Sequence, residues 1–142
     1  MVAEVEIPAG FVPQYALAFG AVDGPAVAVH ADNPLPVRTV RTTAIAPALA
    51  GSMTASGVAG PFVPELDRPI WVSLSGDWSG AAQLLRSVDD GATKLPLTIA
   101  GEPWARFTAN ANEAATEESE GGAVYYLVAT LQSGTLTYRV AQ

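Results

Sequence analysis

The chain of 142 residues has no cysteine, one histidine and few basic residues, and each shortage excludes a kind of chemistry. Without cysteine there is neither a disulfide framework nor a thiolate metal site, and the redox compartment stays open. Seven bases stand against fourteen acids, which gives a formal net charge of -7. Proteins that bind a nucleic-acid backbone carry clustered Lys and Arg, whereas the bases here are scattered singly. We therefore expect no direct nucleic-acid partner.

Long apolar runs are also missing. No stretch approaches the roughly 20 residues needed to cross a bilayer, so we expect no membrane partner. The first six residues carry acids where a signal peptide carries bases, which predicts a soluble protein made in the cytoplasm. Apolar residues nonetheless form 49% of the chain, enough for the core of one domain.

Candidate catalytic and metal-binding residues are few. His30 has no accompanying nucleophile motif such as G-x-S-x-G, so we interpret it as structural and not as a general base. A metal site would need oxygen ligands alone, and Asp89-Asp90-Gly91 lacks the spaced acids of a calcium loop and is typical of a turn. The sequence therefore predicts no catalytic residue, no metal site, no cofactor and no enzyme activity.

The most regular stretch of the chain covers residues 70–91. In residues 70–75 apolar and other side chains alternate, which is the period of a half-buried strand. Gly76-Asp77 predicts a turn, residues 78–87 a second strand, and Asp89-Asp90-Gly91 another reversal. These elements predict a β-meander.

The same pattern continues to the C-terminus, with strands predicted at residues 94–100, 104–109, 123–131 and 135–140. Residues 123–131 have two apolar faces and are predicted to be central. Residues 110–122 are rich in Glu, and we interpret them as an exposed acidic loop, or alternatively as a surface that pairs with a basic partner. Six strands with short turns predict an all-β fold, an antiparallel β-sandwich over residues 61–142.

The first 60 residues have a different texture, rich in Pro, Gly and small side chains. Residues 44–60 offer little side-chain area to bury and are predicted to be a linker, or an arm that orders against a neighbour. We expect residues 1–60 to form an extended N-terminal arm, with a small β subdomain and linker as the alternative. The residues predicted to contact a partner are Phe11, Tyr15, Phe19, Val37, Arg38 and Arg41.

Three tryptophans suggest an alternative site. An aromatic platform for a sugar could be formed by Trp71, Trp78 and Trp104, together with Tyr125, Tyr126 and Tyr138. Tryptophan in a small sandwich more often lies in the core or at an interface, because each ring removes a large area from water. Both readings stay open at the level of sequence.

The second half of the chain carries a resemblance. Leu-Ser-Gly-x-Trp-Ser-Gly at residues 74–80, Leu-x-Arg-Ser-x-Asp-x-Gly at 84–91, Pro103-Trp104 and the closing segment 133–139 resemble small Ig-like virion proteins of tailed bacteriophages and prophages. In the common form of that pattern an aromatic residue follows the Asp-Gly turn. This chain instead has Lys94 before Leu95-Pro96.

The resemblance implies a non-enzymatic phage structural protein, a capsid cement or decoration protein. Such a protein binds the outer capsid surface and stabilises the head, so the implied partner is the major capsid protein, with homo-oligomers on the particle. The implied location is the virion surface, after assembly in the host cytoplasm. An extended arm suits this task because small contacts repeated over several subunits add up. The alternative is a carbohydrate-binding or adhesive β-sandwich module of a phage fibre or tail, with the tryptophans as its site.

Overall fold

The computed structural model describes residues 18–20, 23–38, 40 and 42–142. The chain divides into two compact units, Met1–Thr42 and Thr43–Gln142. In the first unit, β1 (Ala18–Phe19) and β2 (Val27–Ala28) form a short antiparallel pair. The other described strands belong to Thr43–Gln142.

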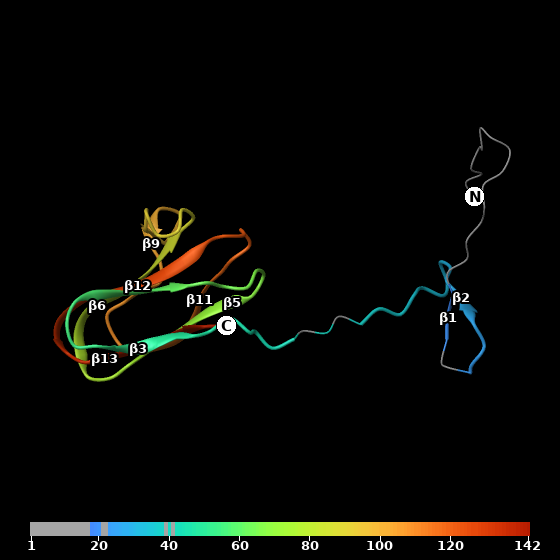
Figure 1. The fold of residues 1–142 in the computed structure, drawn as a ribbon, viewed down its shortest axis with the longest axis horizontal. Coiled ribbons are helices and arrows are strands. Elements are labelled where there is room, and N and C mark those ends of the chain that lie inside the picture. The colour runs from blue at the N-terminus through green and yellow to red at the C-terminus, as the bar shows by residue number, and fades with distance from the viewer. Residues whose placement is uncertain (1–17, 21–22, 39, 41) are drawn as a thin grey trace, which may run out of the picture. The chain divides into compact units, whose positions relative to one another are not determined.

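Thr43–Gln142 contains two antiparallel sheets that lie face to face (Figure 1). The first sheet has the strand order β11-β5-β13-β3. The second sheet has the order β10-β6-β12-β4, and β7 also pairs with β6, while β8 and β9 form a separate ribbon. The strands are β3 (Leu49–Met53), β4 (Gly57–Phe62), β5 (Pro69–Ser75), β6 (Trp78–Ser87), β7 (Leu95–Pro96), β8 (Thr98–Ile99), β9 (Glu102–Pro103), β10 (Arg106–Phe107), β11 (Ala111–Glu117), β12 (Val124–Gly134) and β13 (Leu136–Ala141).

Consecutive strands mostly alternate between the two sheets. From β3 to β6, and again from β10 to β13, each strand lies in the sheet opposite to the one before it. This is the order of a jelly roll, which winds two Greek keys into a sandwich. An immunoglobulin sandwich instead keeps neighbours such as its strands A and B in one sheet. The predicted all-β antiparallel sandwich is confirmed, with jelly-roll winding, and much of the predicted arm, residues 1–17, lies outside the described residues.

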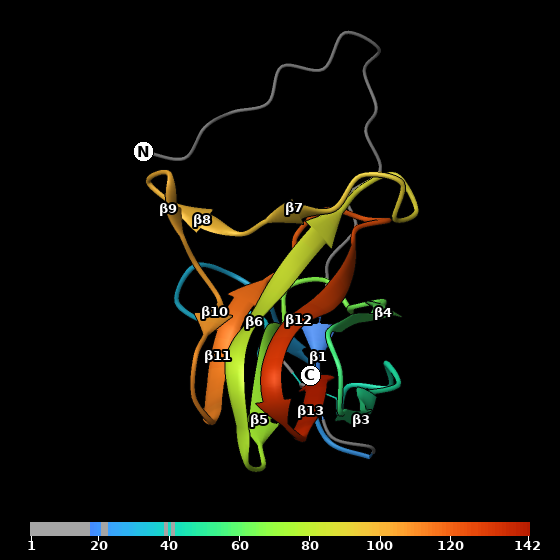
Figure 2. The same ribbon diagram turned by 90° about the vertical axis from the view of Figure 1, so that its left-hand side faces the viewer.

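The core lies between the two sheets. Ile70, Val72 and Leu74 of β5 point inward and are at most 3% exposed, whereas Trp71 points outward and is 44% exposed. This confirms the alternation read from the sequence. The strand predicted to be central, β12, lies between β6 and β4 in the second sheet (Figure 2). The other large, fully buried side chains are Phe62, Leu84, Tyr125, Leu127, Leu136 and Val140.

The predicted linker over residues 44–60 is wrong for most of its length. β3 pairs with β13 and β4 pairs with β12, so both strands complete sheets of the sandwich. Small residues suit these positions because the strands lie at sheet edges and gain stability from backbone pairing. Gly51 also lies against the ring of Tyr138, where an added Cβ would stand 2.7 Å from the phenol oxygen. The division of the chain at Thr42/Thr43 therefore differs from the predicted boundary at residue 60.

The predicted acidic loop over residues 110–122 is also corrected. Most of it is β11, an edge strand that pairs with β5 and contains a bulge between Ala114 and Thr116. Its glutamates misled the interpretation, because an edge strand can expose charged side chains while Ala115 packs into the core. Glu118, just after the strand, is 3% exposed.

Between β6 and β10 the chain first pairs β7 with the end of β6 and then forms the separate β8–β9 ribbon. β7, β8 and β9 run along one end of the sandwich (Figure 2). The β8–β9 ribbon turns at Ala100 and Gly101, which both have positive φ, at 52° and 88°. The loop between β6 and β7 lies against the second sheet, where Lys94 Nζ is 4.5 Å from the centroid of the Tyr126 ring.

Candidate functional site

The residues predicted to contact a partner are only partly described. Phe11, Tyr15 and Arg41 lie outside the described residues. Phe19 is half-buried in β1. Val37 and Arg38 are exposed, and no strand is assigned to either. The structure thus gives two of the six predicted residues as open surface.

Exposed apolar side chains lie close to Val37 in the sequence. Leu35 is 39%, Val37 84% and Val40 68% exposed, and Ile45, at the start of the second unit, is 88% exposed. The described residues from 34 to 48 contain no strand. We call Leu35, Val37, Val40 and Ile45 the apolar segment. Burial of each of these side chains against another surface would stabilise the bound state, because it removes apolar area from water.

His30 has a local structural role. Its Nδ1 accepts a hydrogen bond from the backbone N–H of Asp32, and its backbone pairs with that of Asn33. The Asn33 side chain donates to the Ala28 carbonyl at 2.8 Å. These contacts stabilise the chain reversal after β2. Within the described residues no group of three or more His, Cys, Asp or Glu could hold a metal ion.

The three tryptophans occupy three different environments. Trp71 projects from the outer face of β5. Trp78 packs partly against the core, and its indole N–H donates to Asn110 at 2.8 Å. Trp104 follows β9, is 44% exposed, and donates to the Ala115 carbonyl. Two of the three indole N–H groups thus serve internal contacts, and the three rings do not lie along one strand or one sheet face.

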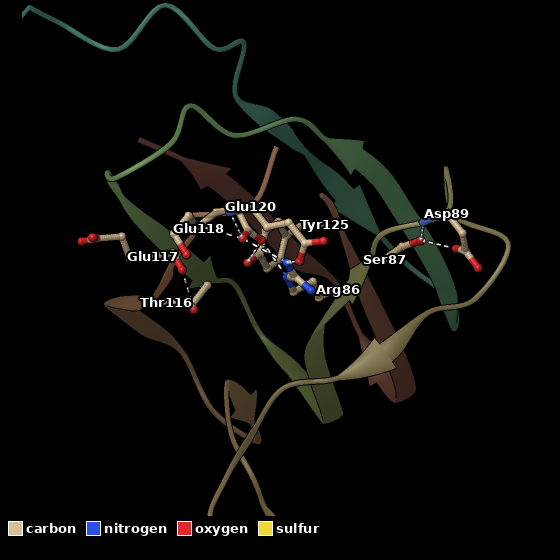
Figure 3. A network of polar contacts seen from close by, with 9 residues as sticks. Arg86, Ser87, Asp89, Thr116, Glu117, Glu118, Glu120 and Tyr125 are labelled. Atoms are coloured by element: carbon tan, nitrogen blue, oxygen red, sulfur yellow. Dashed lines mark hydrogen bonds and ion pairs between the residues drawn. The ribbon is translucent and has the colours of Figure 1, made fainter. Parts of the chain in front are cut away.

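A polar network around the buried Glu118 links the end of β6, the segment after β11 and the start of β12 (Figure 3). Glu118 accepts two hydrogen bonds from Arg86, with Oε2 2.6 Å from Nε and Oε1 3.0 Å from Nη2. The Tyr125 hydroxyl donates to Oε2 at 2.8 Å, and the backbone N–H groups of Ser119 and Glu120 donate to Oε1. Arg86 also bonds the Glu120 carboxylate at 2.6 Å. The described residues contain no buried side-chain N or O atom without a partner.

These contacts shift the ionisation of all three groups. The hydrogen bonds from Arg86 lower the pKa of Glu118 to about 2, because they favour its charged form. Burial and the neighbouring Glu118 carboxylate raise the pKa of Tyr125 to about 12. Hydrogen bonds to Glu118 and Glu120 raise the pKa of Arg86 above its ordinary value. Every member of the network is satisfied internally, so we assign it to stability.

The turn after β6 is the reversal predicted at Asp89-Asp90-Gly91. Ser87 Oγ accepts hydrogen bonds from the N–H groups of Asp89 and Gly91, and Asp89 accepts one from Thr93 N–H. These contacts lower the pKa of Asp89 to about 2, the Thr93 N–H having the largest effect. Gly91 has φ +86°, and an added Cβ would stand 2.1 Å from the Tyr126 hydroxyl oxygen, so only glycine fits.

The outer face of the second sheet contains a polar hollow of about 380 Å³, which sequence reasoning missed. We call this the β6–β12 hollow. It was missed because its residues come from three strands whose register cannot be read from the sequence. Its lining consists of Gly80, Ala81, Gln83, Arg106, Val128, Thr130 and Gln132.

Three comparisons with known proteins found no match. No protein-family model, no curated protein and no solved structure matches it significantly. In the part of the chain that the structure describes, no helix is long and apolar enough to cross a membrane. The functional argument therefore rests on this chain's own residues.

Proposed function

We propose that this protein is a structural protein of a tailed-phage particle that decorates or cements the capsid. In this proposal the apolar segment attaches the chain to capsid subunits, and the jelly roll forms the outer body. The observation that carries the proposal is the strong exposure of Val37, Val40 and Ile45 next to a domain that buries its own core. A partner surface that covered these side chains would remove the exposure.

Magnitudes favour a repeated attachment. Full burial of a Val, Leu or Ile side chain contributes about 1.5 to 3 kcal/mol. In proportion to their exposure, which is 39% for Leu35 and higher for the others, the four residues of the apolar segment offer about 4 to 8 kcal/mol. Ordering the backbone costs about 1 to 2 kcal/mol per residue, or about 11 to 22 kcal/mol over residues 35–45, which exceeds that gain. Pro34 and Pro36 reduce the cost because they restrict the free chain. Binding would then depend on backbone pairing with the partner and on many copies per particle.

The choice of a capsid as partner has three further supports. Residues 70–139 resemble phage virion proteins, as described above. The jelly roll recurs in viral capsid and lectin domains, which is support by analogy of fold alone. The second unit also carries ten acids and five bases, a net of -5, and a negative outer surface would keep particles apart.

The test uses particles that lack this protein. Full-length chain and a chain that begins at Thr43 are added, and copies per particle are counted by quantitative mass spectrometry. We expect the full-length chain to bind at high occupancy and the shortened chain to lose most binding. Equal occupancy of the two would show that the jelly roll attaches the protein, and failure of the full-length chain to bind would contradict the proposal.

A paired substitution isolates the apolar segment. Val37→Asp with Val40→Asp places charge where the proposal requires burial, and should lower occupancy at least tenfold. The matched control is Val88→Asp, since Val88 is 57% exposed but lies in the jelly roll. Its occupancy should stay within twofold of the parent.

A further inference from the structure

We propose that the β6–β12 hollow binds an acidic saccharide, a sugar ring that bears a carboxylate. The proposal concerns the outer face of the second sheet. It adds a binding activity to the structural role proposed above and does not depend on it.

The lining residues form a row across the sheet. Arg106 of β10 is directly opposite Gln83 of β6, Gln83 is opposite Val128 of β12, and Val128 is opposite Val58 of β4. Directly opposed residues point to the same face, and strands are spaced about 4.8 Å apart, so the row spans about 14 Å. One step along the strands, Ala81 faces Thr130 and extends the surface.

The polar side chains of the hollow are free to bind. Those of Gln83, Arg106, Thr130 and Gln132 make no hydrogen bond or ion pair with any other described residue. On the outer face of the first sheet, by contrast, Ser73 donates to Asn112 at 2.8 Å. Four unpaired polar side chains around one hollow present donors and acceptors that a hydroxyl-rich ligand can use in place of water.

The remaining chemistry selects the ligand class. Gly80, Ala81 and Val128 give the hollow small or apolar patches suited to the C–H face of a sugar ring. Arg106 is the cation of the lining, and a guanidinium binds a carboxylate through two parallel hydrogen bonds. A volume of about 380 Å³ lies within the range of small-molecule sites.

The loop after β6 closes one end of this face. Tyr126, two residues from Val128 on the same face of β12, lies under Lys94, whose Nζ is 4.5 Å from the ring centroid. Gly91 is in close contact with the Tyr126 hydroxyl, and Lys94 Nζ donates to the Gly91 carbonyl. The loop therefore limits the hollow on the Tyr126 side of Val128. A bound saccharide chain would extend in the other direction, toward Thr130 and Gln132.

The experiment records amide chemical shifts of the free full-length protein during titration with four acidic oligosaccharides. These are oligogalacturonate, oligomannuronate, a glucuronate-containing disaccharide and sialyllactose, and methyl-esterified oligogalacturonate is the neutral match. We expect at least one acidic sugar to cause saturable shifts centred on residues 80–83, 106 and 128–132. The methyl ester should bind at least tenfold more weakly than its acid.

Two variants test the role of the guanidinium. Arg106→Gln should weaken binding of the acidic sugar about tenfold or more, because it removes a charge-assisted hydrogen-bond pair. Arg139→Gln is the control, since Arg139 is exposed on the first sheet, and should change affinity less than twofold. Equal losses in both variants would show non-specific charge attraction and overturn the site. Absence of saturable shifts at this face with all four sugars, or equal binding of the ester, would also overturn it, whether or not the protein attaches to particles.

Discussion

The two units of this chain bury their side chains very differently. Thr43–Gln142 packs a continuous core between two sheets and pairs every described buried polar group. Met1–Thr42 offers strands of two residues and leaves Val37 and Val40 mostly exposed. One unit thus packs a core of its own, whereas the described part of the other leaves apolar side chains exposed, as the proposed attachment to a partner requires. The predictions below test this contrast, from the largest expected effect to the smallest.

The largest effect should follow deletion of residues 1–60. A chain that begins at Pro61 lacks β3 and most of β4, so β13 and β12 each lose an edge partner and the buried Ala59 is absent. We expect loss of cooperative thermal unfolding, measured by circular dichroism. A sharp transition near the parental temperature would show that the first two strands of the sandwich are dispensable.

The next largest effect should follow Glu118→Gln. The change removes the charge that Arg86 and Tyr125 bond, and leaves their donors without a carboxylate in a mostly buried site. We expect a loss of about 3 kcal/mol in the free energy of unfolding, measured in urea. Glu117→Gln, at an exposed position next to it, is the control and should change stability by less than about 0.5 kcal/mol. Equal losses of unfolding free energy in the two variants would show that the network around Glu118 does not stabilise the fold.

Acid should weaken the jelly roll through the same residue. The pKa of Glu118 is about 2 in the folded protein and near 4.5 in the unfolded chain. Its stabilising contribution is therefore present above pH 4.5 and is lost as the pH falls from 4.5 toward 2. Urea unfolding across this range should show a smaller decline for Glu118→Gln than for the parent. Parallel pH profiles would contradict the assignment.

Raising the pH above 10 should also lower the stability of the jelly roll, in this case through Tyr125. Its pKa is about 12 in the folded protein, above the ordinary value of 10.0. The corresponding stability is present below pH 10 and is lost as the pH rises toward 12. Tyr125→Phe should flatten this part of the pH profile, and Tyr138→Phe serves as the control because it removes the same hydroxyl group from a partly buried ring outside the network.

How much of this could be predicted from sequence depended on the range of the interactions. The alternation in β5 and the turn at Asp89-Asp90-Gly91 are local patterns, and both were predicted correctly. The jelly-roll winding and the edge strand β3 were not, because small residues such as Ala50 and Gly51 carry no periodic signal and their pairing depends on distant strands. Glu118 looked like solvent-exposed charge because its partner, Arg86, is 32 residues away.

The hollow on the second sheet illustrates the same limit. Arg106 and Gln83 become neighbours only through the pairing of β10 with β6. Neither belongs to a recognisable motif. The tryptophans, which did stand out in the sequence, lie in separate environments in the structure.

The smallest effect should follow deletion of residues 1–42, and it bears most directly on the contrast between the units. We predict that the chain beginning at Thr43 has the same urea midpoint as the full-length chain, within error, because its core and its polar network are complete.

The measurement that tests the central claim most directly is hydrogen exchange of the full-length protein, free and bound to particles. The account predicts that the amides of residues 37–41 exchange rapidly in the free protein and become protected on particles, while the core strands β5, β6 and β12 exchange equally slowly in both states. Protection of residues 37–41 in the free protein, or protection on particles confined to the jelly roll, would contradict it.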